Sequence, residues 1–383
     1  MALAQLGLRN VLLVQLALTP GTDAQFTGSR LRITNACTSA PMWIAHNAHG
    51  TVGPDMQNTK IEALQSFDFL TPDGLSATRY WPKMFCDAEG NKCGLGGSGG
   101  PGEKCVGNGD YRVCAPPIDT KFEATFGQTG QPCDETSQLG CDNVDVSFVD
   151  GWTLPFRMEM NGECTTSNHG GTAPSVIDCQ EMSFDNCPTN EFLSTLGQSV
   201  SLQAINSFTK SIAGCYSPCT KLIDDKWQND FAQGRTSTDS AVSPYCCPGG
   251  PQGLSPEQCR AGPIKDTQYV QAVHTYCPGT YSYAYDDAMG LYKCNSATTY
   301  HVFFYCPSVM QTPTRSAVPQ RPIWLWSLLI LMVVLAVVGI VALIFGSRLW
   351  LAEYQQPSPH ERVPRTQVHA RGPQQGLIGG GFF

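Results

Sequence analysis

The sequence predicts a mainly β, disulfide-bonded domain that is exported and attached to one membrane-spanning helix. Three observations support this prediction: apolar and polar residues alternate in several short segments, all 18 cysteines lie between residues 37 and 306, and an uncharged run of 24 residues follows them. Alternation with a period of two is typical of half-buried strands. An even number of cysteines in an exported segment indicates disulfides.

The alternating segments predict strands along most of the domain. Residues 144–149 and 156–160 flank the turn Asp150-Gly151. Further strands are predicted at 30–34, 42–44, 78–86, 121–126 and 300–306, and residues 281–287 are expected to end another strand with two carboxylates. Two amphipathic helices are predicted, over residues 192–205 and over 266–276, where Asp266 is the expected cap.

Residues 1–24 are predicted to form a secretory signal peptide. Arg9 precedes the apolar run 11–18, which is too short to span a bilayer, and small residues follow it. The rival interpretation of the cysteines is a zinc site that includes Cys215 and Cys219, but no second Cys/His pair has the usual spacing. The sequence therefore predicts disulfides, with no metal and no cofactor.

The uncharged run 323–346 is predicted to be a transmembrane helix, because about 20 apolar residues cross the hydrocarbon core. Tryptophans stand at both of its ends, as in an aromatic belt: Trp324, Trp326 and Trp350. Residues 308–322 are predicted to be a stalk and 347–383 a disordered cytoplasmic tail. Together with the signal peptide, this predicts a single-pass plasma-membrane protein whose N-terminal domain is extracellular.

Charge and motif spacing exclude two classes of function. The formal net charge of −8 argues against nucleic-acid binding, which needs a basic surface. Residues 94–100 match both G-x-G-x-x-G and G-x-S-x-G, but they do not lie between a strand and a helix, as a phosphate cradle or a nucleophile elbow requires. They are interpreted as a flexible insertion in a disulfide-closed loop.

Two carboxylates stand on and just after the predicted strand 144–149, at Asp145 and Asp150. Strict alternation places them on opposite faces, so they converge only if the chain bends or bulges near Asp150. The simplest interpretation is a solvated strand face and a hairpin turn. The alternative is an acidic site.

Several motifs, in order, resemble the thaumatin-like proteins. The matching segments are Ile33–Cys37, Arg79–Trp81, Pro116–Pro117, Thr120–Glu123, Val144–Pro155, Tyr245–Cys247, Tyr281–Asp287 and Phe304–Pro307. The resemblance implies a flattened β-sandwich core (25–85, 115–163 and 278–307) with two disulfide-rich lobes. The small lobe is 86–114 and the larger lobe is 164–277, within one extracellular domain at 25–307.

The resemblance also implies eight disulfides, and proximity joins the two surplus cysteines, Cys133 and Cys141. The implied pairs are Cys37–Cys306, Cys86–Cys93, Cys105–Cys114, Cys164–Cys294, Cys179–Cys277, Cys187–Cys215, Cys219–Cys246 and Cys247–Cys259. The first of these would join the two ends of the domain.

A cleft lined by an arginine and four carboxylates is implied by the same resemblance. The matching positions are Arg79, Glu123, Asp145, Asp150 and Asp286, with Asp287 as an alternative for the last. Such a set suits sugars, because ionised carboxylates accept hydrogen bonds from hydroxyls and arginine donates in a fixed fork.

For function, the resemblance implies binding of β-1,3-glucan, with weak endo-glucanase activity in some members, in defence against fungi or in cell-wall contact. Hydrolysis needs one protonated and one ionised carboxyl, and the sequence assigns Glu123 as the acid and Asp145 or Asp150 as the base. The alternative function is a non-catalytic adhesion or receptor ectodomain that binds another glycan or a protein. With either function, the protein is expected to be a monomer.

Overall fold

The computed structural model describes residues 28–307 except 106–113, 135, 167–170 and 252, together with Gly339. The chain divides into two units, Met1–Thr314 and Arg315–Phe383, and residues 28–307 belong to the first. The predicted signal peptide, stalk and cytoplasmic tail lie outside the described residues, as does the predicted membrane helix apart from Gly339. Within the described part of the chain, no helix has the length and apolar character needed to cross a bilayer.

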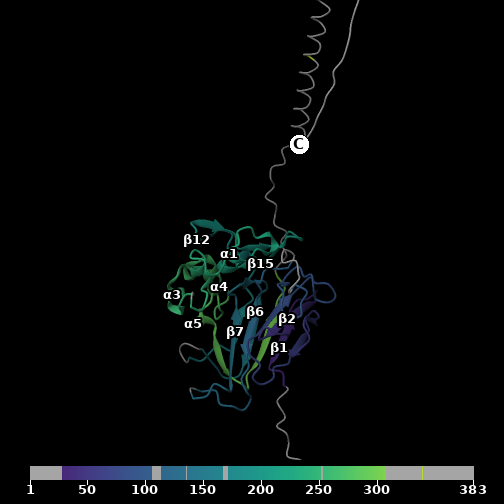
Figure 1. The fold of residues 1–383 in the computed structure, drawn as a ribbon. Coiled ribbons are helices and arrows are strands. Elements are labelled where there is room, and N and C mark those ends of the chain that lie inside the picture. Colours follow the sequence, from purple (N-terminus) through teal and green to yellow (C-terminus); the bar gives the residue numbers. More distant parts are fainter. Residues whose placement is uncertain are drawn as a thin grey trace, which may run out of the picture. The chain divides into compact units, whose positions relative to one another are not determined.

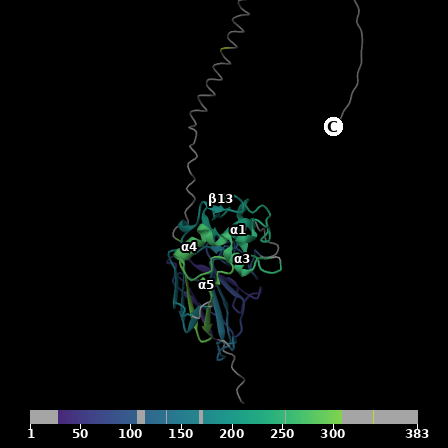
Figure 2. The same cartoon turned by 90° about the vertical axis from the view of Figure 1, so that its left-hand side faces the viewer.

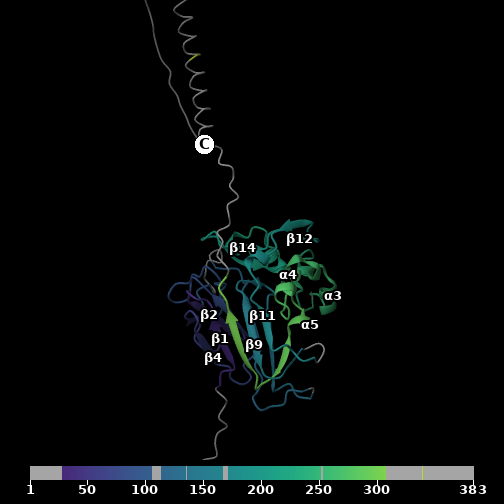
Figure 3. The ribbon, with the colours of Figure 1, turned by 180° about the vertical axis from the view of Figure 1, so that it is seen from behind.

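Two large sheets form the core of this unit. One has seven strands in the order β10-β16-β7-β6-β5-β2-β3, and the other has five in the order β11-β9-β17-β1-β4. Figure 1 shows the first sheet through β7, β6 and β2, and Figure 3, turned by 180°, shows the second through β11, β9, β1 and β4. The strands of the two sheets are β1 (Leu31–Asn35), β2 (Met42–Ala48), β3 (Thr59–Ile61), β4 (Ser66–Phe69), β5 (Thr78–Lys83), β6 (Lys121–Thr125), β7 (Cys141–Ser147), β9 (Phe156–Asn161), β10 (Cys164–Thr166), β11 (Val176–Cys179), β16 (Tyr292–Asn295) and β17 (Thr299–Phe304).

Aromatic side chains of the two sheets meet between them. The ring of Tyr80 on β5 lies 5.2 Å from that of Phe69 on β4, and the rings of Phe122 on β6 and Tyr300 on β17 are 6.0 Å apart, centroid to centroid. Because successive side chains of a strand point to opposite faces, burying Phe122 turns Glu123 to the outer face of the seven-stranded sheet. The predicted mainly β architecture is confirmed.

Short helices and hairpins make up the larger lobe, which lies at one end of the two sheets (Figures 1 and 2). Its strands form two small sheets, from β12 (Glu191–Leu193) and β13 (Gln198–Val200), and from β14 (Gln203–Ile205), β15 (Ile212–Tyr216) and β8 (Gly151–Trp152). Its helices are η1 (Phe184–Asn186), α1 (Pro218–Ile223), η2 (Lys226–Gln228), α2 (Ser243–Cys246), α3 (Pro256–Ala261), η3 (Pro263–Asp266) and α4 (Gln268–Tyr276), and α5 (Asp287–Gly290) follows the lobe.

Three local predictions in this part of the chain are wrong. Residues 192–205 form strands and not a helix, because Gly197, with φ of +61°, turns the chain between β12 and β13. The second predicted helix is present as α4, but its cap is Thr267, whose side chain accepts from the amide of Val270. Residues 281–287 form no strand beyond one bridge between Tyr281 and Ser147.

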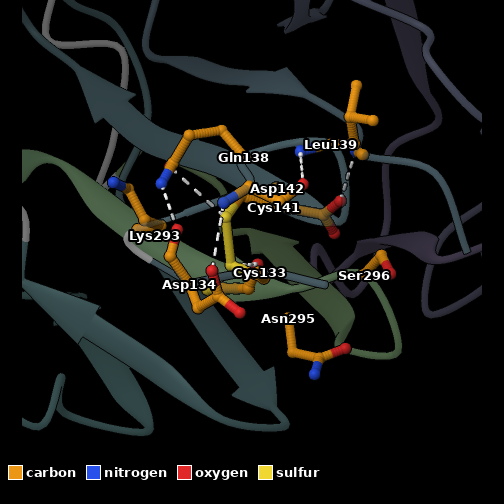
Figure 4. The surroundings of a disulfide bond; sticks show 12 residues. Cys133, Asp134, Gln138, Leu139, Cys141, Asp142, Lys293, Asn295 and Ser296 are labelled. Carbon is orange, nitrogen blue, oxygen red and sulfur yellow. Dashed lines mark hydrogen bonds between the residues drawn. A yellow bond between two sulfur atoms is a disulfide. The ribbon is translucent and has the colours of Figure 1, made fainter. Parts of the chain in front are cut away.

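Nine disulfides join the described cysteines, in the same pairs that the resemblance and proximity imply. They are Cys37–Cys306, Cys86–Cys93, Cys105–Cys114, Cys133–Cys141, Cys164–Cys294, Cys179–Cys277, Cys187–Cys215, Cys219–Cys246 and Cys247–Cys259. Figure 4 shows the surplus pair, Cys133–Cys141, beside Lys293 and Asn295 of β16.

A buried ion pair joins the two sheets. Arg30 donates from Nη1 to both oxygens of Asp142, at 2.7 and 3.0 Å, and to the carbonyl of Ser296. The same carboxylate accepts from the amide of Gly127 and from the hydroxyl of Tyr300. Both carboxylate oxygens therefore have partners, as a buried charge requires.

Candidate functional site

A row of polar side chains crosses four strands of the seven-stranded sheet on its outer face. The strand register places Asn47 of β2 opposite Arg79 of β5, Arg79 opposite Glu123 of β6, and Glu123 opposite Asp145 of β7. Directly opposed residues have Cβ atoms about 5 Å apart. Three of the five residues implied for the cleft are therefore neighbours, although 66 residues separate Arg79 from Asp145 in the chain.

The row borders a surface hollow of 470 Å³. Its lining also includes His49, Thr125, Asn143 and Leu291. Arg79 donates from Nε to Oε1 of Glu123 at 2.7 Å, and the two side chains are 54% and 23% exposed. An exposed ion pair of this kind contributes at most about 1 kcal/mol to stability, so the fold does not depend on it.

Asp145 is the least satisfied member of the row. Its Oδ1 is buried and has no hydrogen-bond partner among the described residues. Burial and the negative charges of Glu123 and Asp287 raise the pKa of this carboxyl well above its ordinary value, against the opposing charge of Arg79. The row therefore holds a carboxyl that keeps its proton more readily than a free aspartate, next to one that is paired with arginine.

Asp287 continues the acidic face beyond Asp145. Its two oxygens accept from the hydroxyl of Tyr281 and from Nη2 of Arg260, each at 2.7 Å. Tyr281 lies along the edge of β7, where its amide donates to the carbonyl of Val146. Arg260 of the larger lobe thus forms a second arginine–carboxylate pair with Asp287, which follows the lobe in the chain, and the charge of Asp287 acts on Asp145.

Asp286, the first choice for the fifth cleft position, has a different environment. It is buried, and its Oδ2 accepts from the amide and hydroxyl of Ser282 and contacts Nε2 of His274 at 2.8 Å. Ser282 is buried and contacts the same histidine nitrogen, so these three residues do not form a nucleophile–base–acid relay. Asp286 is thus occupied by Ser282 and His274, whereas Asp287 is partly exposed and its charge acts on Asp145. Neither residue lines the hollow beside Arg79.

Asp150 reaches the outer face because the chain turns after β7. The amide of Gly151 donates to the carbonyl of Phe148, and a methyl group at Gly151 would lie 2.2 Å from the carbonyl of Cys215. The carboxylate of Asp150 pairs with Lys121, which stands on the same face of β6 as Glu123. The chain therefore bends after β7, as convergence with Asp145 would require. Asp150 nevertheless pairs with Lys121, one row away from Asp145, and does not line the hollow.

No metal site accompanies these acids in the described residues, where no three His, Cys, Asp or Glu side chains are grouped to hold an ion. Sequence analysis missed Asn47, Lys121 and Arg260 as members of the surface. Lys121 stands at an alternating position of the predicted strand 121–126, so correct strand pairing would have placed it on this face. Asn47 lies beyond the predicted strand 42–44 and is on the face because β2 continues to Ala48. No local signal connects Arg260 with Asp287.

Comparison with known proteins identifies a family relationship over this whole region. A family model described as the Thaumatin family matches residues 35–307. A Prunus avium protein named glucan endo-1,3-beta-glucosidase is 30% identical over 259 residues, which are 66% of this chain and 81% of that protein.

Two further relatives carry the family's other names. Thaumatin-like protein 1b of Malus domestica is 29% identical over 265 residues, which are 67% of this chain and 96% of the relative. Pathogenesis-related protein 5 of Arabidopsis thaliana is 27% identical over 245 residues, or 63% of this chain and 75% of the relative.

Proposed function

Because the chain belongs to the thaumatin family, we propose that it binds β-1,3-glucan through the face that carries Arg79, Glu123 and Asp145. The observation that carries the proposal is the solvent-open row of these residues beside a 470 Å³ hollow. Sugar hydroxyls would hydrogen-bond the accessible members of the row, Arg79 and Glu123, which are 54% and 23% exposed. The name of the Prunus avium relative, glucan endo-1,3-beta-glucosidase, supports the choice of ligand.

The same row suits hydrolysis of a bound glucan. Asp145, whose pKa burial raises, would donate its proton to the glycosidic oxygen. The carboxylate of Glu123, ion-paired with Arg79, would take a proton from the attacking water or would itself attack the sugar as the nucleophile. These roles are the reverse of those assigned from the sequence, where Glu123 is the acid. The reason is that burial raises the pKa of Asp145, whereas Glu123 is ion-paired with Arg79. Asp150, half-exposed beside Lys121, is the second candidate base.

Display at the plasma membrane is a separate part of the proposal. The uncharged run 323–346 supports a single membrane-spanning helix, and nine disulfides support passage through an oxidising compartment. A glucan-binding domain held at the cell surface would act in defence against fungi or in contact with a cell wall. The anchor equally supports an adhesion or receptor ectodomain, in which the same face binds without hydrolysis.

The proposal is tested by retention of the full-length chain on insoluble β-1,3-glucan, with a reducing-sugar assay of the released products. Glu123→Gln is expected to lower retention about tenfold, because the variant loses one charge-assisted hydrogen bond to the ligand. Asp68→Asn is the matched control. Asp68 also forms an exposed arginine–carboxylate pair, with Arg32 at 2.6 Å, but on the five-stranded sheet.

The outcomes separate the candidate functions. Retention with sugar release supports a hydrolase, and retention without release supports the adhesion or receptor function. Equal retention on cellulose, or equal loss with Asp68→Asn and Glu123→Gln, contradicts a specific site on this face.

A further inference from the structure

Along the direction of the strands, the outer face next to the hollow is open on one side of Arg79 and covered on the other. Along β5 and β6, Arg79 and Glu123 are 54% and 23% exposed. One row further on the same face, Trp81, Lys121 and Ser147 are only 3%, 6% and 5% exposed. Residues two apart on a strand are about 6.6 Å apart, so the outer face becomes buried within roughly the length of one sugar unit.

The cover over Trp81 is the glycine-rich part of the small lobe, the glycine segment of residues 94–104. A methyl group at Gly100 would lie 2.8 Å from the ring of Trp81, and one at Gly96 would lie 2.2 Å from the carbonyl of Pro82. Only glycine allows this segment to approach β5 so closely. The indole Nε1 of Trp81 is buried beneath it with no hydrogen-bond partner among the described residues.

The glycine segment is anchored at three points, one on β5 and two in loops next to the sheet, although its composition suggested a flexible insertion. Glu103 pairs with Lys83 of β5, and the two side chains are 3% and 2% exposed. The hydroxyl of Ser98 donates to Asp119, two residues before β6. The carbonyl of Pro101 accepts from the side-chain amide of Gln57 at 2.7 Å.

The larger lobe closes the same end of the face from the other side. Lys121 pairs with Asp150, whose carbonyl accepts from the amide of Ser217 in the lobe, and Ser147 is bridged to Tyr281. At the opposite end of the hollow, His49 and Gly50 are exposed. A chain that runs along the strands could therefore enter past His49 but could not continue over Trp81.

We propose that the glycine segment makes the cleft a blind pocket that takes the end of a glucan chain instead of its interior. This inference rests on the proposed function and adds the specificity of the site. The terminal sugar would lie against Arg79, Glu123 and Asp145, and the remaining units would leave past Thr125 and Asn143. Binding would then depend on the number of chain ends and not on the mass of polymer.

The test measures how much full-length protein an insoluble β-1,3-glucan retains before and after partial acid hydrolysis, which multiplies chain ends at constant mass. Retention is expected to rise roughly in proportion to the ends. Affinity for soluble oligosaccharides is expected to stop rising once the hollow is filled. Retention that is independent of the ends, with affinity that grows for every added unit, would overturn the inference while leaving glucan binding intact.

A variant pair tests the role of the glycine segment. Gly100→Ala forces the segment away from Trp81, and it is expected to bind unhydrolysed polymer about tenfold better, equivalent to about 1.4 kcal/mol of removed steric exclusion. Gly97→Ala is the control in the same segment, because its added methyl group would meet only Cys93, at 3.4 Å.

The results of this pair distinguish the two proposals. Gly100→Ala that binds polymer like Gly97→Ala, with an unchanged melting temperature, contradicts the inference. If Gly100→Ala fails to fold, the chain-end measurement on the unmodified chain decides. Absence of binding to every glucan, hydrolysed or not, contradicts the proposed function and the inference together.

Discussion

Two carboxylates stand three residues apart on β7 and face opposite sides of its sheet. Asp142 points into the core, where both of its oxygens have partners from Arg30, Gly127 and Tyr300. Asp145 points to the outer face, where Arg79 contacts its neighbour Glu123 and Oδ1 has no partner among the described residues. The same residue type on one strand is thus fully hydrogen-bonded at one position and has an unpaired oxygen among the described residues at the other.

The difference follows from the cost of burying polar groups. A buried charge is tolerated when it is paired and fully hydrogen-bonded, and removing one partner leaves the other uncompensated. A carboxyl that is partly buried without partners destabilises the folded state, and natural proteins retain such groups mostly at functional sites. Satisfied bonding therefore indicates a structural role, and unsatisfied bonding beside a hollow indicates a functional one.

The largest effect is expected from Asp142→Ala. The substitution leaves Arg30 charged and buried without its carboxylate, which should lower the free energy of unfolding by about 3–5 kcal/mol. Denaturant unfolding of the full-length chain measures the change. The control Asp68→Ala breaks the exposed pair with Arg32 and should cost at most about 1 kcal/mol. Equal losses of unfolding free energy in the two variants would contradict the expectation that the buried ion pair stabilises the fold more than the exposed one.

Asp145→Asn should have its effect on function and not on folding. The variant cannot donate a proton, so glucan hydrolysis should fall about 10²–10⁴-fold. Because the pKa of Asp145 is raised in the folded state, its protonated form adds stability at low pH, and this stability is lost as the pH rises through the raised pKa. The variant should therefore unfold at the same or higher temperature at neutral pH. A marked loss of stability at neutral pH would indicate that Asp145, like Asp142, supports the fold.

Asp119 extends the comparison to the segment just before β6, where it accepts from Ser98 of the small lobe. Burial raises its pKa to about 7, and its Oδ1 is buried without a partner among the described residues. The stability that its protonated form contributes is present below about pH 4 and is lost as the pH rises through about 7. Asp119→Asn should therefore be more stable than the parent at pH 8 by roughly 1–3 kcal/mol. Thermal unfolding at pH 4 and pH 8 measures this, and an equal change at both values would contradict it.

The smallest effect is expected from Asp287→Asn. The negative charge of Asp287 is one cause of the raised pKa of Asp145, so the variant should move the transition assigned to Asp145 in the pH–rate profile to lower pH. Stability should change by no more than about 1 kcal/mol, because the pair with Arg260 is partly exposed. Asp286→Asn provides the contrast, since it disturbs the buried contacts with His274 and Ser282. An unchanged pH–rate profile would mean that the charge of Asp287 does not influence Asp145.

Much of the site could be predicted from alternation, and the errors have physical causes. Lys121, Glu123 and Thr125 alternate with buried residues of β6, so their outer-face position follows from the strand period. The predicted helix over 192–205 failed because an apolar spacing compatible with a helix is also compatible with two short hairpin strands joined by Gly197. The choice between Asp286 and Asp287 remained open in the sequence because adjacent residues share every local signal.

The sequence by itself indicated seven of the twelve strands of the two large sheets and which of their side chains share a face, because these depend on backbone geometry that repeats over two residues. Through the ordered cysteines and motifs, it also indicated the family and the nine pairings. The tertiary structure alone decided that burial and Asp287 act on Asp145, and that Gly100 covers Trp81. Those properties arise where distant segments pack together. Desolvation and charge act through space, between residues that are far apart in the sequence.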